Sequence, residues 1–204
     1  MASPDGNSAL GKPACVPVQL ESSARPLKGL FPPAYRSAAA RDLGIILDVN
    51  PTVTAWECGS RQIGVGSMRH RADFTVHDVD GTIWLMDAPD RNPKAEEAVL
   101  DACARALGLR YRKVDRSEIY DGFRLRNAQD LLRYGSLQVP LGDRVRLLAV
   151  LDENGSLTFG ECLQIFRETK AVAALASMIP HGFIEVDLDD ALIGPETRVT
   201  RMRT

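Results

Sequence analysis

Apolar and polar residues alternate with a period of two around the middle of the first half of the chain. Phe74 and Val76, and then Ile83 and Leu85, are separated by polar residues, which predicts two half-buried strands. The sequence Asp-Val-Asp-Gly lies between them, and its glycine is free to adopt a positive φ. The pattern therefore predicts an antiparallel hairpin within residues 71–91.

Helical and strand patterns flank this hairpin. The predicted helices are residues 37–47 and 92–107, and the predicted strands are residues 52–58 and 109–114. Asn92 is a suitable N-cap, Pro93 suits the first helical position, and Gly108 is a typical helix end. The stretch 63–70 is interpreted as a connector, because its glycines lack the lysine of a phosphate-binding loop. The order of helix, three strands, helix and strand predicts a small α/β domain.

The second half of the chain is mostly helical in its pattern. Helices are predicted over residues 124–134, 141–153, 159–166 and 170–179, and one strand over residues 183–188. Thr158 and Glu161 have the spacing of a capping box at the third of these helices. Helix, turn, helix, helix and strand is the pattern of a winged helix. Residues 27–120 and 121–204 are therefore predicted to be separate domains, and residues 1–26, which lack periodicity, a flexible arm.

Composition narrows the classes of partner. The 204-residue chain is 45% hydrophobic and 25% charged, with a formal net charge of −2, which is typical of a globular protein. Any nucleic-acid contact must therefore come from a local basic patch. We see no apolar run long enough to cross a bilayer and no signal peptide, so we expect a cytoplasmic protein without a membrane partner. The four cysteines are far apart, so a zinc site is not expected.

Several motifs in chain order resemble those of the TnsA family of transposon-end endonucleases. The similar segments are residues 33–56, 71–89, 106–119, 139–163 and 192–199. Residues 71–89, for example, are similar to the family's Pro-Asp-Phe hairpin, with Ala72 in place of its proline. The resemblance implies an α/β fold with a PD-(D/E)xK restriction-endonuclease-like domain, followed by a mostly helical winged-helix-like domain.

The resemblance also indicates which residues would carry chemistry. Enzymes of this kind hydrolyse phosphodiesters with Mg²⁺ or Mn²⁺ held by carboxylates and with a nearby lysine. Asp73 keeps the first ligand position, and Asp87 lies where the family has Glu or Gln. Pro89, however, replaces the lysine, and Arg36 and Ala40 replace two helix glutamates. At least two expected catalytic groups are therefore missing.

A remnant or migrated active site remains an open alternative. Lys94 could replace the lost lysine and Glu57 a lost carboxylate, which gives Asp73, Asp87, Lys94 and Glu57 as the candidate catalytic set. An active enzyme would hold Mg²⁺ or Mn²⁺ between Asp73 and Asp87. Otherwise no cofactor is expected, and these side chains are solvated strand carboxylates and a surface lysine.

The basic residues suggest how DNA would be bound. The candidate recognition helix, residues 170–179, is nearly all alanine and apolar, so base reading is not expected. Cations cluster upstream instead, and the candidate DNA-binding residues are Arg110, Arg112, Lys113, Arg124, Arg126 and Arg133. If they share a face, they would contact phosphates without reading sequence.

These observations favour a catalytically impaired TnsA-like protein that acts by binding. Double-stranded DNA, a protein partner, or both would be bound within a transposition or DNA-processing assembly. Two alternatives stay open. One is an active metal-dependent endonuclease with a rearranged site, and the other is a regulator in which the winged helix acts and the first domain is a scaffold.

Overall fold

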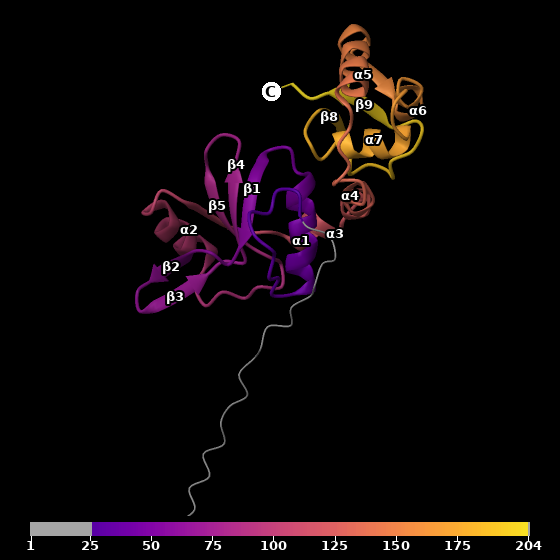
Figure 1. The fold of residues 1–204 in the computed structure, drawn as a ribbon. Coiled ribbons are helices and arrows are strands. Elements are labelled where there is room, and N and C mark those ends of the chain that lie inside the picture. Colours follow the sequence, from indigo (N-terminus) through magenta and orange to yellow (C-terminus); the bar gives the residue numbers. More distant parts are fainter. Residues whose placement is uncertain (1–25, 204) are drawn as a thin grey trace, which may run out of the picture.

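The computed structural model describes residues 26–203, and within them the fold is mixed α/β, with three β-sheets and helices packed against them (Figure 1). The α/β class predicted from the sequence is confirmed. The predicted arm lies almost wholly in residues 1–25, outside the described residues. None of the helices in the described part is long and apolar enough to cross a membrane.

A four-stranded sheet forms the centre of the N-terminal part. Its strands, in spatial order, are β1 (Val53–Cys58), β4 (Phe74–Asp78), β5 (Ile83–Asp87) and β6 (Arg110–Lys113). The first three are antiparallel, whereas β6 runs parallel to β5. Gly81 has a φ of 84° in the turn between β4 and β5, so the predicted hairpin is confirmed.

One helix covers each face of this sheet. On one face, α1 (Ala38–Val49) begins after Ser37, whose hydroxyl accepts a hydrogen bond from the Ala40 N–H, and buries Leu43 against the core that contains Trp56. On the other face, α2 (Glu97–Arg105) buries Leu100 in a second apolar cluster. Because apolar side chains are buried on both faces, the two helices hold the sheet in place, and with it the ends of its strands.

Two predictions for this half are wrong. The stretch interpreted as a connector forms a second hairpin of β2 (Gln62–Val65) and β3 (Met68–Arg71). Ile63 of this hairpin is buried in the apolar cluster under α2, and that burial stabilises the strand pair. Helix α2 starts at Glu97 rather than Asn92 and buries Leu100, so tertiary packing overrides the local capping signal. A short helix, α3 (Arg116–Tyr120), was also not predicted.

The C-terminal part contains the predicted helices and a small sheet. Its elements are α4 (Arg124–Leu132), α5 (Leu141–Asn154), β7 (Ser156–Thr158), α6 (Phe159–Leu163), α7 (Ala171–Met178), β8 (Ile184–Val186) and β9 (Arg198–Arg201). The capping box of Thr158 and Glu161 is present at α6. Strand β9 lies between β7 and β8 and is antiparallel to both. Of these strands, only β8 was predicted.

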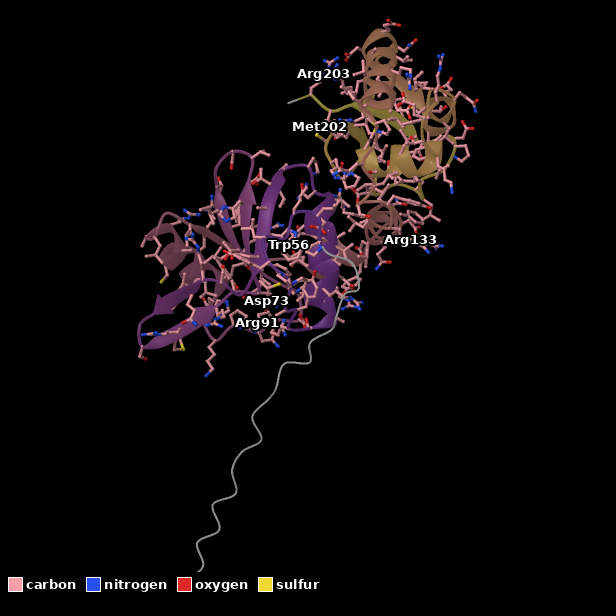
Figure 2. The ribbon with its side chains drawn as sticks, in the orientation of Figure 1. Trp56, Asp73, Arg91, Arg133, Met202 and Arg203 are labelled. Atoms are coloured by element: carbon pink, nitrogen blue, oxygen red, sulfur yellow. The ribbon has the colours of Figure 1, made fainter. Side chains whose placement is uncertain are left out.

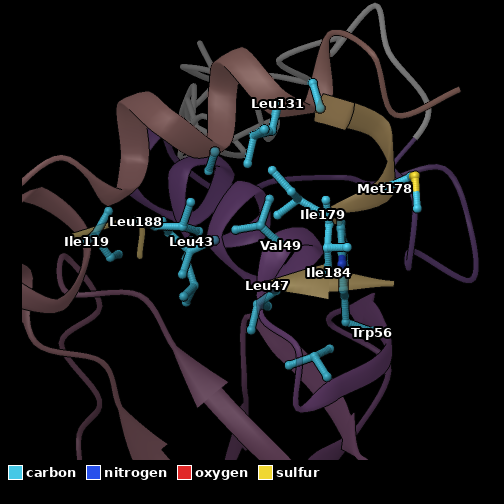
Figure 3. Close-up of a cluster of buried hydrophobic side chains, with 14 of the residues drawn as sticks. Leu43, Leu47, Val49, Trp56, Ile119, Leu131, Met178, Ile179, Ile184 and Leu188 are labelled. Atoms are coloured by element: carbon cyan, nitrogen blue, oxygen red, sulfur yellow. The ribbon is translucent and has the colours of Figure 1, made fainter. Parts of the chain in front are cut away.

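A continuous apolar cluster joins the two parts. Figure 3 shows Leu43 and Leu47 of α1 in the same cluster as Leu131 of α4 and Ile184 of β8. The four-stranded and three-stranded sheets nevertheless lie on opposite sides of residue 120 in the chain. The catalytic candidates Asp73, Asp87 and Glu57 lie on or next to strands of the four-stranded sheet, and Lys94 lies in the loop between β5 and α2.

Candidate functional site

The β4–β5 hairpin brings the two candidate metal ligands together. Asp73 immediately precedes β4, and Asp87 ends β5. The Asp73 N–H donates a hydrogen bond to Asp87 Oδ1 at 3.0 Å, and the Ala88 N–H donates to Asp73 Oδ2 at 3.1 Å. The register of the hairpin therefore places both carboxylates at one end of the sheet, as the sequence predicts.

Asp87 is fully buried, and its oxygens are already occupied. The Tyr111 hydroxyl donates to Asp87 Oδ2 at 2.7 Å, and His70 Nε2 lies 2.7 Å from the same oxygen. Burial, together with the hydrogen bond to Asp87, raises the pKa of the Tyr111 hydroxyl, which keeps it protonated as a donor. A metal at Asp87 would have to displace these partners from a site without access to water.

Asp73 is bound by an arginine in place of a metal. Arg36 Nε and Nη2 donate to the two oxygens of Asp73 at 2.9 and 3.2 Å. The same guanidinium donates to Asp90 Oδ1 at 2.7 Å, so it bridges two carboxylates. The hydrogen bond to Asp73 raises the pKa of Arg36 still further, and Arg91 adds a second guanidinium nitrogen 3.7 Å from Asp73. Figure 2 shows Asp73 and Arg91 side by side in the N-terminal part.

The other two catalytic candidates do not complete a metal site. Lys94 lines the groove beside Arg36 but forms no ion pair with Asp73 or Asp87. Glu57, on β1, lies opposite Thr75 of β4 and makes no hydrogen bond to Asp73 or Asp87. Across residues 26–203 there is no group of three or more His, Cys, Asp or Glu side chains placed to hold a metal ion.

A basic groove of about 610 Å³ opens beside Arg36. Its lining contains five cations and a single carboxylate, Asp90, and the cations are Arg36, Arg69, Arg71, Arg91 and Lys94. Arg69 and Arg71 were not among the predicted binding residues, because Arg69 lies in the supposed connector and Arg71 only begins the segment predicted as the β4–β5 hairpin. The alternation of Arg-His-Arg over residues 69–71 was the available signal for a strand with two outward-facing arginines.

Most of the predicted DNA-binding cations are paired within the protein. Arg110 pairs with Asp101, Arg112 with Glu118, Arg124 with Asp189 and Arg133 with Asp130. Lys113 and Arg126 form no ion pair in the part of the chain that the structure describes. Arg133, which follows α4, lies far from Asp73 and Arg91 (Figure 2). Since internal carboxylates compensate these cations, they attract phosphate less than unpaired cations do.

The apolar helix of the C-terminal part faces inward. In α7, Ala174 through Met178 are buried, and the Ser177 hydroxyl donates to the Leu137 carbonyl at 2.7 Å. Val172 is the exposed apolar residue of this helix. The helix therefore presents no polar side chains of the kind that read base edges.

A scan against protein-family models gives no match, and a search of curated proteins finds no significant match. Membership of the TnsA family is therefore not shown and stays a prediction. The chemistry available to the site follows from the contacts of Asp73 and Asp87 and from the charge of the groove.

Proposed function

We propose that the chain is a catalytically impaired TnsA-like protein that binds double-stranded DNA without cutting it, as part of a transposition or DNA-processing assembly. The observation that carries this proposal is the position of Arg36. Its guanidinium bridges Asp73 and Asp90, where a hydrolytic site would need open carboxylate oxygens. The residue that the TnsA resemblance expects at this position is a glutamate.

The order of the elements supports both halves of the proposed architecture. The N-terminal part contains a helix, an antiparallel three-strand unit, a second helix and a parallel strand, in that order. A PD-(D/E)xK domain would need the same elements. In the C-terminal part, α5, β7, α6, α7, β8 and β9 follow the order of a winged helix, with the last strand between the other two. These topologies are compatible with the family resemblance.

The chemistry of the site argues against hydrolysis. A metal ion lowers the pKa of bound water and stabilises charge on the phosphate. Arg36 can supply positive charge, but a guanidinium cannot coordinate water or generate hydroxide. Pro89 has no side-chain amine to take the role of the missing lysine. The site therefore keeps cations that attract phosphate and lacks the group that would activate a nucleophile.

The charge of the neighbouring groove supports DNA as the ligand. Three of the lining cations, Arg69, Arg71 and Lys94, form no ion pair within residues 26–203, so an anion would be attracted even though the whole chain carries a net charge of −2. Binding to a duplex backbone would release counterions and would be strongest at low salt. Because α7 is apolar and largely buried, it does not present the polar side chains that sequence-specific reading of bases requires.

The test is the affinity for a short duplex with and without divalent metal. We expect fluorescence anisotropy to show duplex binding in EDTA at low salt, and Mg²⁺ or Mn²⁺ not to strengthen it. Divalent ions compete for the phosphate backbone, so they should weaken the binding. Binding that requires the metal would contradict the proposal, as would no binding at low salt.

A further inference from the structure

The β2–β3 hairpin stands apart from the main sheet and has two different faces. It forms a two-stranded sheet of its own and projects from the side of the molecule opposite the C-terminal part (Figure 1). Ile63 and His70 are cross-strand partners, and both face the protein body, where Ile63 is 1% exposed. Because side chains alternate along a strand, the neighbouring pairs Gln62 with Arg71 and Gly64 with Arg69 face outward.

The outward face of the hairpin carries arginines that are not paired with carboxylates of the described residues. Arg69 and Arg71 are exposed, and neither forms an ion pair within residues 26–203. The amide of Gln62 lies 2.7 Å from the Arg71 guanidinium, which orients that side chain without neutralising it. Arg110 on β6 and Arg124 on α4 differ in this respect, since each faces a carboxylate.

The outward face is also open enough for a close approach. A Cβ added at Gly64, which lies opposite Arg69, would meet no atom within 4 Å. Gly66 occupies the turn with a φ of 58°, and it too has open space around it. A two-stranded ribbon of this kind is narrow enough to enter the major groove of DNA, which is about 12 Å wide.

The hairpin is held in a fixed orientation next to the basic groove. His70 Nε2 lies 2.7 Å from the buried Asp87, and the His70 ring meets the Tyr111 ring edge-on at 5.7 Å between centroids. These contacts attach β3 to the end of β5. Arg69 and Arg71 also line the groove that contains Arg91 and Lys94, so one anionic chain could contact all four cations.

From these observations we infer that the β2–β3 hairpin is the principal DNA-contacting element, in which Arg69 and Arg71 hold backbone phosphates of a duplex. The inference rests on the proposed function, because it requires a protein that binds DNA. It differs from the sequence-based expectation, which assigned that contact to the basic residues between Arg110 and Arg133.

The test compares two double variants that remove the same charge. Arg69→Gln with Arg71→Gln changes the hairpin, and Arg112→Gln with Arg126→Gln changes the surface expected from the sequence. Duplex affinity is measured by fluorescence anisotropy over a series of salt concentrations. We expect the hairpin variant to bind about 10- to 100-fold more weakly at low salt, and the slope of log K against log salt to become less negative by about 1.8. The matched variant should keep a slope close to that of the wild type.

A third variant adds a negative charge without removing an arginine. Gly64→Glu fits the open space opposite Arg69 and should weaken binding, whereas Gly64→Gln should have little effect. Circular dichroism checks that every variant is folded. If the wild type binds but the hairpin variant has the wild-type affinity and slope, the inference is wrong and the proposed function stands. A wild type that binds no duplex at low salt would overturn both.

Discussion

Replacement of Arg36 by glutamine tests whether the guanidinium serves as the resident cation of this site. Arg36→Gln removes the charge and the bridge between Asp73 and Asp90 while keeping a polar side chain. Asp73 would then retain the Ala88 N–H at 3.1 Å and the more distant Arg91 at 3.7 Å. A nearly buried carboxylate would lose its main counterion.

The structure sets the size of the expected effect. The side chains of Asp73, Arg36 and Asp90 are 4%, 32% and 42% exposed, respectively. Breaking a fully buried ion pair costs about 3–5 kcal/mol, whereas exposed pairs contribute about 1 kcal/mol or less. The partly exposed Arg36 lies between these cases, so we expect Arg36→Gln to lower the free energy of unfolding by about 2 kcal/mol. For a chain of this length that corresponds to a decrease in Tm of about 4–8 °C.

Urea and thermal unfolding in EDTA measure this loss, with Arg105→Gln as the control. Arg105 is 61% exposed and pairs with Asp101 one turn away, so its loss should cost about 0.5 kcal/mol at most. Millimolar Mn²⁺ should stabilise Arg36→Gln and not the wild type, because Asp73 and Asp90 then offer free hard oxygens. An Arg36→Gln protein as stable as the wild type, with no response to Mn²⁺, would refute this reasoning.

Two further substitutions test buried polar contacts, one in the N-terminal part and one in the C-terminal part. Tyr111→Phe removes the hydroxyl that donates to the buried Asp87 and should cost about 1–2 kcal/mol in thermal unfolding, with duplex affinity unchanged. Asp143 is fully buried, and although burial opposes ionisation, hydrogen bonds from the Arg167 N–H, Arg146 and Thr169 hold its pKa well below the usual range. A lowered folded-state pKa gives stability that is present above the unfolded pKa of about 3.9 and is lost as the pH falls below it. Asp143→Asn should therefore lower the urea midpoint at neutral pH and reduce the loss of stability that we expect in the wild type as the pH falls below about 4; equal pH dependence in both proteins would contradict this.

Local sequence signals predicted the elements that local interactions determine. The turn at Gly81 and the capping box of Thr158 and Glu161 each involve residues close in the chain, and both are present. The turn also fixed the hairpin register, and so the contact of Asp73 with Asp87 followed from the sequence.

Contacts between distant segments could not be predicted in this way. Arg36 reaches Asp73 across 37 positions, and Tyr111 reaches Asp87 across 24, so both depend on how α1 and β6 pack on the sheet. Strand β9 pairs with β7, which is three residues long and lies 40 or more positions away in the chain. In the β2–β3 hairpin, Gly64 and Gly66 interrupted the apolar alternation, although they form part of an ordered ribbon.

The central claim is that Asp73 binds Arg36 instead of a catalytic metal, so that the protein binds DNA without cutting it. Incubation of supercoiled plasmid with the purified wild-type protein in Mg²⁺ or Mn²⁺, beside an Asp73→Ala control, tests this most directly. We predict that the plasmid stays supercoiled with the wild type, and that any nicking common to both proteins comes from a contaminating nuclease. Nicking by the wild type that disappears in Asp73→Ala would contradict the claim.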